Sequence, residues 1–526
     1  MKNSQVAAID TANKIFSSIS ELSNKHIHFV GIKGTGMAAL VEICAYRGAF
    51  ITGSDVKERF YTDEILENLK IKVTNFSEKN ITHDIDLLVY SSAYLVEKNP
   101  ELIKASTIGI PMIGYAEALG ALSLGAWSCG IAGVHGKTST TAICGTILEQ
   151  LKLPVQVLAG SVVQSFLTNG QKSCSHGSCT LNIGQKYFVA ETCEYQRHFM
   201  NFHPNAIILT SVESDHQDYY PTYDDIRNAF VDYCCLLPKN GKLIYCADDK
   251  GAIEVSNIVA KKRVDIIMIP YGFTAVGDFG ISNYEVAHSK QTFSVNKFGN
   301  TKKFSLFIPG KHNVLNSTAC IALADEILQN ENTTILQNYN QIVDGLSSYH
   351  GSRRRCEIVA DTFIAPKVPL TIIDDYGHHP TAILKTLEGL RDFYKDRYII
   401  VDFMSHTYTR TAALFERFAQ CFSAADMVIL NKIYPSAREI YNGKITGKTL
   451  YEEAKKYHSN VFYAKEFEEA SALVLSVLQK NLTNLASGAP NTDTSIPKKG
   501  FLFVTMGAGD NWKVGVQVLN TIKKIK

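Results

Sequence analysis

The sequence predicts an α/β protein of three domains, in which helices cover largely parallel sheets. Short apolar runs alternate with helical patterns along most of the chain, which is typical of doubly wound sheets. Several of these runs end in Gly-rich or polar turns, where such sheets bind their ligands. The chain has 526 residues, too many for one core, because domains contain about 100–200 residues. We expect domains at 1–126, 127–345 and 346–526.

The composition excludes several classes of protein. Lys and Arg total 53 against 51 Asp and Glu, so no basic excess indicates nucleic-acid binding. The first 20 residues lack the apolar core of a signal peptide, and four glycines and two serines interrupt the uncharged run 118–134. The 12 cysteines are scattered, as expected for reduced thiols. We expect a cytoplasmic protein without membrane insertion, either monomer or homodimer.

The clearest motif is the turn Gly133-Val134-His135-Gly136-Lys137-Thr138. An apolar strand, 128–132, precedes it and a helical pattern, 138–151, follows it. Glycines let backbone N–H groups approach phosphate oxygens, and a helix start presents unpaired donors. Lys137 is placed to reach the β/γ-phosphates and Thr138 to hold Mg²⁺. The strict P-loop spacing needs a glycine where this chain has Ile131, so the motif is the shorter form. It predicts a nucleoside triphosphate site.

A second glycine turn follows the predicted strand 26–32. Gly34, Thr35, Gly36 and Met37 open the predicted helix 37–48, and Asp55 follows the next strand about 20 residues later. This pattern predicts a diphosphate at a helix N-terminus, whatever the nucleoside. Taken alone it also suits an NAD-linked oxidoreductase, which leaves the P-loop unexplained. Ser92, at the end of the strand 84–94, is where a ligand would lie.

Acidic and histidine side chains follow two strands of the middle region. Strand 186–194 ends in Glu191 and Glu194, and the strand from 205 is followed by Glu213, Asp215, His216 and Asp218. Strand ends gather ligands in such sheets, so these side chains are candidates for Mg²⁺ contact, with solvated loop charge as the alternative. The functional interpretation is favoured for Glu191 and His216, and both interpretations stay open for Glu194 and Asp218.

Other stretches of the middle region have less specific patterns. The alternation at 265–308 predicts an antiparallel patch, and 164–186 predicts a surface insertion. A zinc cluster of Cys174, His176, Cys179 and Cys193 has no standard spacing, so a loop is preferred. His312 and Asn316 stand where a helix, 315–328, begins, and either cap it or face a nucleotide base.

The last third repeats the unit of strand, polar turn and helix. Three arginines, 353–355, form a basic turn or place a cation beside ATP phosphates. The strand at 368 leads to Tyr376 and His378, and the strand at 398 leads to His406 and Arg410. These units predict a second doubly wound sheet facing a cleft. The polar segment 480–499 is expected to be a loose insertion.

The motifs together resemble the Mur ligases of peptidoglycan synthesis. The resemblance covers about residues 26 to 510 and depends on these stretches in the family's order: GIKGTGM (31–37), GVHGKTSTT (133–141), AETCEY (190–195), ESDHQDYY (213–220), GKHNVLNSTA (310–319), RRRCE (353–357), DDYGHHPT (374–381), HTYTRT (406–411) and YPSARE (434–439). Many separated motifs in one order are more specific than any one of them.

The resemblance implies a function and a role for each site. The branch most similar joins L-alanine to UDP-N-acetylmuramate with ATP and Mg²⁺, through an acyl phosphate. Residues 133–139, ending at Ser139, would hold ATP, and the N-terminal glycine turn would hold the UDP diphosphate. The resemblance places Thr138, Glu191 and His216 at Mg²⁺, places His312, Asn316 and Arg355 at the nucleotide, and places Tyr376, His378, His406 and Arg410 at the muramoyl carboxylate and amino acid. His378 or His406 is a candidate proton acceptor.

Two departures from the family pattern bear on specificity. Thr407 stands where the family has an arginine before the tyrosine, so one contact to the amino-acid carboxylate is absent. The usual acidic cluster keeps Glu191 but loses a neighbouring acid. The alternatives are a related branch that attaches a recycled tripeptide, and a P-loop switch without ligase chemistry.

Overall fold

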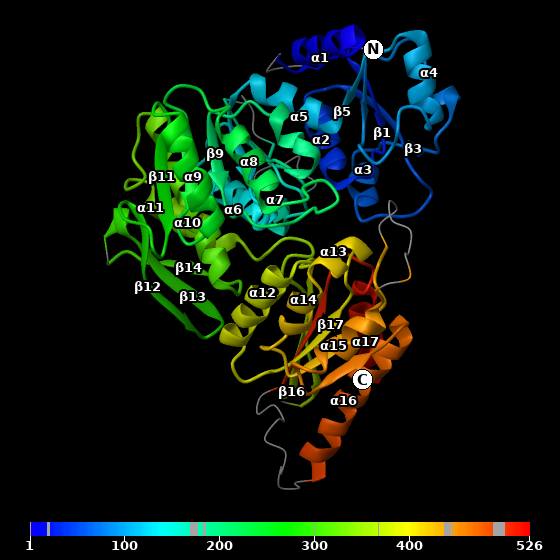
Figure 1. Cartoon of the computed structure of the whole chain (residues 1–526), viewed down its shortest axis with the longest axis vertical. Coiled ribbons are helices and arrows are strands. Elements are labelled where there is room, and N and C mark those ends of the chain that lie inside the picture. The colour runs from blue at the N-terminus through cyan, green and yellow to red at the C-terminus, as the bar shows by residue number, and fades with distance from the viewer. Residues whose placement is uncertain are drawn as a thin grey trace.

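The computed structural model describes residues 2–17, 22–168, 177–181, 186–299, 301–366, 368–435, 443, 445–487 and 500–525. These residues form three sheets, and each sheet is accompanied by helices in its own part of the chain (Figure 1). The predicted α/β class is confirmed. None of the described helices is long and apolar enough to cross a membrane.

The N-terminal sheet has five parallel strands in the order β3-β2-β1-β4-β5. The strands are β1 (His26–Val30), β2 (Phe50–Ser54), β3 (Val73–Thr74), β4 (Leu87–Tyr90) and β5 (Met112–Gly114). The helices are α1 (Lys2–Ser17), α2 (Thr35–Tyr46), α3 (Asp63–Asn68), η1 (Glu78–Asn80), α4 (Pro100–Ile108) and α5 (Tyr115–Leu124). The strand order reverses between β1 and β4, which is where Rossmann-like sheets open a crevice for ligands.

The central sheet has nine strands in the order β14-β13-β12-β11-β10-β9-β6-β8-β7. The strands are β6 (Trp127–Ala132), β7 (Val155–Leu158), β8 (Tyr187–Glu191), β9 (Ala206–Leu209), β10 (Lys242–Cys246), β11 (Ile267–Gly272), β12 (Phe279–Ala287), β13 (Lys290–Val295) and β14 (Phe304–Leu306). β6 pairs in parallel with both β8 and β9, so the turn after it lies between the two acidic strand ends.

Helices pack along the central sheet and complete its core. They are α6 (Lys137–Gln150), α7 (Gln164–Thr168), η2 (Tyr195–Asn201), α8 (Tyr223–Cys234), α9 (Lys250–Lys262), η3 (Asn296–Phe298), α10 (Lys311–Asn330) and α11 (Tyr339–Ser348). α6, which follows the phosphate loop, packs against α10 and α11. It is buried along most of its length, so tertiary packing rather than an exposed amphipathic face stabilises it.

The C-terminal sheet has six strands in the order β15-β16-β20-β17-β18-β19, with only β15 antiparallel among the described strands. The strands are β15 (Glu357–Ala365), β16 (Val368–Asp375), β17 (Tyr398–Phe403), β18 (Met427–Leu430), β19 (Val461–Tyr463) and β20 (Phe501–Met506). The helices are α12 (Pro380–Phe393), α13 (Tyr408–Ala413), α14 (Phe415–Gln420), α15 (Gly447–Ala454), α16 (Phe467–Ser487) and α17 (Trp512–Ile525).

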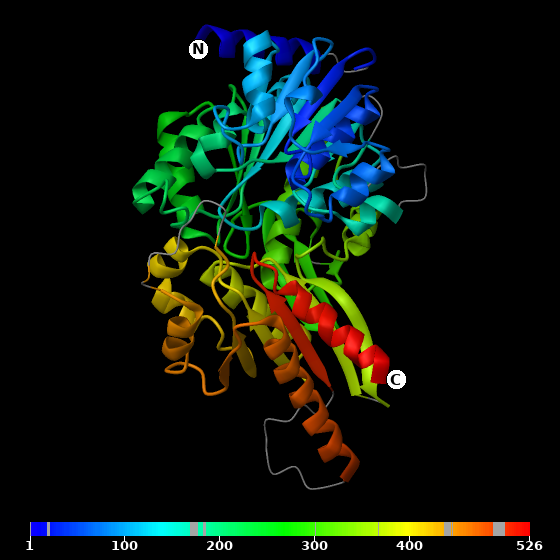
Figure 2. The same cartoon turned by 90° about the vertical axis from the view of Figure 1, so that its right-hand side faces the viewer.

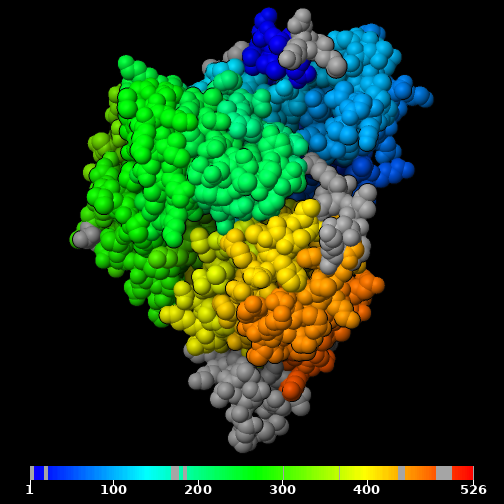
Figure 3. Space-filling view, viewed as in Figure 1, coloured from blue at the N-terminus to red at the C-terminus, as the bar shows by residue number. Residues whose placement is uncertain are grey.

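The buried apolar side chains form a core that the N-terminal and central parts share, whereas the C-terminal part has cores of its own. One continuous core extends from α1 to residue 349 and includes both the N-terminal and the central sheet. Two other clusters pack on the C-terminal sheet and belong to it alone. Figures 2 and 3 show the C-terminal part below the other two, in contact with the central part. A movement of the C-terminal part therefore disturbs less apolar packing than a movement between the first two parts.

Several local expectations need correction. The patch at 265–308 is antiparallel only from β12 to β14, because β11 pairs in parallel with β10 and β12. The helix expected at 315–328 begins at Lys311, after Gly310 at a φ of +95°. α16 continues to Ser487 and so occupies the start of the expected insertion at 480–499. Residues 488–499 lie outside the described residues.

The expected surface insertion at 164–186 is partly internal. Phe166 in α7 is fully buried and packs over Gly145 of α6, where an added Cβ would overlap the ring. Cys179 is buried as well. Residues 169–176 and 182–185 lie outside the described residues, and with them two members of the zinc alternative, Cys174 and His176.

Candidate nucleotide and ligase site

The phosphate loop joins β6 to α6 at the carboxyl edge of the central sheet. Gly133 has a φ of +138° and Gly136 a φ of +85°, a region that L side chains rarely adopt. A Cβ at Gly133 would overlap Thr210 Oγ1, and one at Gly136 would lie 3.1 Å from Asn316 Oδ1. The loop therefore requires glycine at both positions, for backbone conformation and for space. Lys137 begins α6, as a phosphate-binding helix start requires.

Lys137 is held at the site by a neighbouring carboxylate. Its Nζ donates to Glu194 Oε2 at 2.8 Å and to the carbonyl oxygen of Gly133 at 2.5 Å. Glu194 Oε1 lies 3.1 Å from His216 Nε2. Burial acts to raise the pKa of Glu194, but Lys137 and His216 outweigh it and hold that pKa at about 2. Glu194, for which both interpretations were open, thus orients the lysine and the histidine.

The predicted metal ligands differ in whether their ligand atoms already form hydrogen bonds within the protein. Glu191 Oε2 is buried and has no hydrogen-bond partner within the described part of the chain. Thr138 Oγ1 accepts from Arg355 Nη2 at 3.2 Å. Carboxylate and hydroxyl oxygens suit Mg²⁺, so Glu191 and Thr138 fit that ion. The Nε2 of His216 is hydrogen-bonded to Glu194 in this arrangement.

The three consecutive arginines have three different partners. The Arg353 guanidinium lies 4.8 Å from the ring centroid of Tyr61 in the N-terminal part. Arg354 donates to Asp374 at 2.9 Å, within the C-terminal part. Arg355 contacts the phosphate loop at Thr138. Only the third therefore matches the expected cation beside the phosphates.

His312 and Asn316 lie in the first turns of α10 and line the same cavity as the loop. Burial lowers the pKa of His312 to about 4, so its imidazole is neutral at neutral pH. Its Nδ1 is buried and lacks a partner among the described residues. Neither side chain is the helix cap, because the N-cap position is Gly310. Their place at the cavity suits contact with the nucleotide.

Arg410 joins the C-terminal part to the central part. Its Nε donates to Asp215 Oδ1 at 3.0 Å and its Nη2 to Asp215 Oδ2 at 3.4 Å, and both side chains are buried. The Arg410 Nη1 lies 3.4 Å from His406 Nδ1. His378 Nδ1 lies 3.0 Å from the carbonyl oxygen of Tyr376. Burial, with Arg410 as the next cause, lowers the pKa of His378 well below its ordinary value.

Thr407, the departure from the family pattern, has an unusual backbone. Its φ is +70° and its ψ is 139°, which is costly for a β-branched residue. Hydrogen bonds hold it there, because its N–H donates to Tyr434 O at 3.0 Å and its carbonyl accepts from Thr411 Oγ1 at 2.6 Å. Its own hydroxyl accepts from Arg410 N and caps α13. The residue therefore shapes the turn that carries His406 and Arg410.

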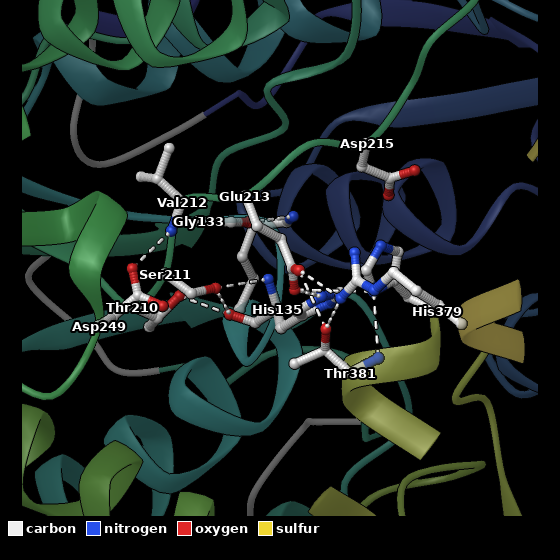
Figure 4. Close-up of polar contacts among 12 residues, drawn as sticks. Gly133, His135, Thr210, Ser211, Val212, Glu213, Asp215, Asp249, His379 and Thr381 are labelled. Carbon is white, nitrogen blue, oxygen red and sulfur yellow. Dashed lines mark hydrogen bonds and ion pairs between the residues drawn. The ribbon is translucent and has the colours of Figure 1, made fainter. Parts of the chain in front are cut away.

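Glu213 was expected only as one of several candidates for Mg²⁺ contact after a strand, and the structure gives it protein partners from two parts of the chain. Its Oε1 lies 2.5 Å from His135 Nε2, in the phosphate loop, and its Oε2 accepts from Thr381 Oγ1 at 3.0 Å (Figure 4). Arg417 Nη2 is 3.3 Å from the same Oε2, and His379 Nδ1 is 3.6 Å from Oε1. Burial acts to raise the pKa of Glu213, but the histidines and Thr381 hold it at about 2. Its place after a strand indicated a position near the ligand, but it did not indicate these partners.

The predicted residues of the N-terminal part surround a separate turn. Thr35 Oγ1 lies 2.7 Å from the Tyr61 hydroxyl. Asp55 accepts from Lys33 N at 2.7 Å and from Tyr94 OH at 2.9 Å, so it joins the loop after β2 to the glycine turn after β1. A Cβ at Gly36 would lie 2.6 Å from Tyr115 OH. The other predicted members are Gly34, the N-cap of α2, Met37, which is buried, and Ser92, which is exposed.

A cavity of about 650 Å³ lies between the central and C-terminal parts. Its wall includes the predicted residues Val134, His135, Gly136, Lys137, Thr138, Ser139, Glu191, His216, His312, Asn316, Arg355 and His378. Gly133, Tyr376, His406 and Arg410 are not in that wall, nor are the N-terminal candidates. The structure thus brings the nucleotide and metal candidates together around one space, and places His378 beside them.

This fold and site define a P-loop nucleotide-binding protein with three α/β parts. Family models agree with each part: "Mur ligase family, catalytic domain" matches 26–127, "Mur ligase middle domain" matches 131–324, and "Mur ligase, glutamate ligase domain" matches 354–489. The chain belongs to the Mur ligase family. The family resemblance expected from the motifs is confirmed.

Curated relatives cover nearly the whole chain. The UDP-N-acetylmuramate–L-alanine ligase of Treponema pallidum (strain Nichols) is 44% identical over 506 residues, which is 96% of this chain and 98% of the relative. The protein of the same name from Borreliella burgdorferi is 37% identical over 492 residues, covering 93% and 97%.

Solved structures agree with the fold. UDP-N-acetylmuramate–alanine ligase MurC from Thermotoga maritima has a TM-score of 0.72 at 23% identity, covering 95% of this chain and 100% of that one. The murein peptide ligase from Psychrobacter arcticus has a TM-score of 0.61 at 21% identity, covering 95% and 98%. At these identities the structures show the fold alone. That fold agrees with the expected three-domain architecture.

Proposed function

We propose that this protein joins L-alanine to UDP-N-acetylmuramate in a reaction that consumes ATP. The observation that carries the proposal is the identity of 44% to an L-alanine ligase over 96% of the chain, together with a phosphate loop that faces the C-terminal histidines across one cavity. We also propose the domain limits 1–126, 127–345 and 346–526 and a cytoplasmic location, where both nucleotide substrates occur. The N-terminal glycine turn then holds a UDP diphosphate rather than NAD.

The first step activates the substrate carboxylate. A carboxylate oxygen attacks the γ-phosphorus of ATP, the bond from phosphorus to the β–γ bridging oxygen breaks, and an acyl phosphate and ADP form. This step needs charge neutralisation and alignment rather than covalent help from the protein. Lys137 and Arg355 supply positive charge at the loop, and Glu194 keeps the lysine directed toward it. The N–H groups of the loop and of α6 add fixed dipoles.

The second step forms the amide. The neutral amine of alanine attacks the acyl carbon and a tetrahedral intermediate forms. Phosphate then leaves with the electron pair of the C–O bond and takes up the extra proton of the nitrogen. The ammonium form must first lose a proton. Either His378 or His406 is the proposed acceptor, and burial, which lowers the pKa of His378, keeps that imidazole unprotonated but makes it a weaker base. Arg410 and His406 lie beside it and suit the amino-acid carboxylate.

Mg²⁺ would be held by Glu191 and Thr138, with His216 joining them when it leaves Glu194. When bound, the ion would neutralise charge on the phosphate oxygens. The unpartnered Glu191 Oε2 supports this assignment. The chain's own part is to hold two oxygen ligands beside Lys137, with Arg355 close to one of them.

The proposal is tested by phosphate release from purified enzyme with ATP, Mg²⁺ and UDP-N-acetylmuramate. We expect release on adding L-alanine and little release with the tripeptide of cell-wall recycling. Release with the tripeptide but not with alanine would assign the protein to the murein peptide ligase branch instead. Slow hydrolysis that is indifferent to the UDP-sugar would indicate a P-loop switch, and an absorbance change with NADH would indicate an oxidoreductase. Glycine and serine in place of alanine would show the effect of Thr407 on selectivity.

A further inference from the structure

One carboxylate, Glu213, accepts hydrogen bonds from two parts of the molecule at once. Its Oε1 faces His135 of the phosphate loop at 2.5 Å, and its Oε2 faces Thr381 and Arg417 of the C-terminal part at 3.0 and 3.3 Å. Arg417 Nη2 also donates to Thr381 Oγ1 at 2.7 Å, so the C-terminal side is itself a connected pair. Oε2 thus contacts the C-terminal part alone, whereas Oε1 contacts His135 and lies 3.6 Å from His379 Nδ1 of the C-terminal part.

The loop side of this contact is firmly positioned. The His135 N–H donates to Ser211 Oγ at 3.0 Å, and its carbonyl accepts from Thr210 Oγ1 at 2.5 Å. His135 stands directly before Gly136 and Lys137, whose N–H groups would face the phosphates of a bound nucleotide. The segment after β9, which also carries Glu213, fixes the backbone of His135, so the remaining freedom of His135 is its side chain, which Glu213 holds (Figure 4).

The C-terminal side presents positive potential to the carboxylate. Thr381 is the second residue of α12, a helix of 14 residues whose N-terminus carries partial positive charge. Arg417, in α14, adds a full charge. The Glu213 side chain is 23% exposed, and its pKa lies well below the ordinary value, so the carboxylate is ionised. The carboxylate therefore favours the docked position of the C-terminal part over an undocked one.

We propose that Glu213 is a positioning residue that couples docking of the C-terminal domain to the side-chain position of His135 in the phosphate loop. The inference deepens the proposed function and rests on it. When the domain docks, Thr381 and Arg417 fix Oε2, and the remaining oxygen is then aimed at His135. Without that docking, the carboxylate is free to turn and the loop loses a hydrogen bond. Phosphoryl transfer is therefore fastest when the C-terminal domain, which carries His378, is docked.

The same side chains could be considered as a metal site, because the ligand atoms of His135, Glu213 and His379 lie within 4.8 Å of one another. Two observations favour the hydrogen-bonded interpretation. The Oε1 that would bind the ion already lies against His135 Nε2, and the Arg417 guanidinium stands beside Oε2. Arg417 already neutralises the charge of this carboxylate, which leaves less negative charge to hold an ion.

The proposal is tested by a double-mutant cycle between two residues that both contact Glu213. His135→Ala and Thr381→Val are made singly and together, first with Glu213 present and then with Glu213→Gln, and kcat is measured by phosphate release. With Glu213 present, each single change should lower kcat about tenfold. In the double variant, kcat should fall by about as much as in the more damaging single variant. With Glu213→Gln the two changes should no longer be coupled. The KM for UDP-N-acetylmuramate, which binds in another domain, should stay within about twofold.

Additive effects in both backgrounds, or coupling that survives Glu213→Gln, would overturn the proposal. Glu416→Gln is the matched control, because it makes the same chemical change at an exposed position next to Arg417 and should leave kcat unaltered. If the wild type has no ligase turnover, the proposed function fails, and the same cycle is measured in the affinity for AMP-PNP. Stoichiometric binding of Zn²⁺ to wild type, lost in His135→Ala, would replace the coupling with a metal site.

Discussion

Arg410 and Asp215 form a buried two-point ion pair between the C-terminal and central parts, with distances of 3.0 and 3.4 Å. Arg410 was expected to bind the amino-acid carboxylate, and it does face His406. Two of its nitrogens are nevertheless committed to Asp215, and the third, Nη1, faces His406 Nδ1 at 3.4 Å. Asp215 therefore acts as the element that aims Arg410 across the domain boundary.

Replacing Asp215 by Asn should separate these roles. The change leaves the Arg410 guanidinium buried without its counter-charge, and breaking a buried pair in this way costs about 3–5 kcal/mol. We expect kcat/KM for alanine to fall by at least about 100-fold. Steady-state phosphate release measures it. Asp232→Asn, which removes an exposed partner of Arg197, is the control and should change kcat/KM less than about twofold. Near wild-type kinetics in Asp215→Asn would contradict this role.

Lys137→Ala should remove turnover while leaving the fold intact. The lysine contributes charge to the transferring phosphoryl group, and loss of such a contact lowers kcat by about 10²–10³. Circular dichroism and thermal unfolding establish that the variant is folded, and single-turnover phosphate release measures the loss. Lys186→Ala, which removes an exposed partner of Glu331, serves as the comparison. Should Lys137→Ala retain near wild-type activity, the loop is not the nucleotide seat.

Glu191→Gln tests the metal assignment. The amide keeps the shape but loses the negative charge that attracts Mg²⁺, so we expect the Mg²⁺ concentration for half-maximal activity to rise about tenfold or more. Excess EDTA should abolish activity in the wild type and Mg²⁺ should restore it. Glu254→Gln, an exposed residue that accepts from Tyr223, should leave the Mg²⁺ dependence unaltered. An unchanged Mg²⁺ titration for Glu191→Gln would exclude this carboxylate as a ligand.

The sequence predicted the parts that depend on local pattern. The strand, glycine turn and helix at Gly133–Thr138 could be read directly, because backbone conformation and phosphate chemistry restrict the residue types there. The contacts of Glu213 with Thr381 and Arg417 could not be predicted in this way. These residues are far apart in the chain and meet only because the central and C-terminal parts face each other. The three arginines illustrate the same limit, since neighbours in sequence have partners in three different parts of the molecule.

A buried carboxyl in the C-terminal sheet, Asp402, lies apart from the site and has no role in the chemistry proposed. Its two oxygens accept from Asn431 Nδ2 at 3.0 Å and Asn511 Nδ2 at 3.1 Å. Burial raises its pKa to about 7, although both amides act to lower it. The Oδ1 atoms of Asn431 and Asn511 are buried without partners in the described part of the chain. The group is therefore a source of pH-dependent stability.

The sign of that dependence follows from the two pKa values of Asp402. In the unfolded chain the carboxyl ionises near its ordinary pKa of 3.8, and in the native protein it ionises near about 7. Between these values the native state binds more protons than the unfolded state, so the free energy of unfolding falls as pH rises. The stabilising contribution is complete below about pH 4 and lost above about pH 7. The total is on the order of 4 kcal/mol.

Asp402→Asn should remove this slope. An amide at 402 carries no charge to bury, and its NH₂ group can donate to Asn431 Oδ1 or Asn511 Oδ1. The displaced amide donors have other acceptors, because Asn511 Nδ2 already donates to Met506 O at 3.0 Å and Asn431 Nδ2 lies 3.4 Å from Ala464 O. We expect the variant to gain stability relative to wild type at pH 8 and little or none at pH 4.5. Urea denaturation at the two pH values measures the difference, with the exposed Asp510→Asn as control. Equal stability differences at both pH values would show that Asp402 is ionised throughout, because only a carboxyl that binds a proton on folding makes the difference depend on pH.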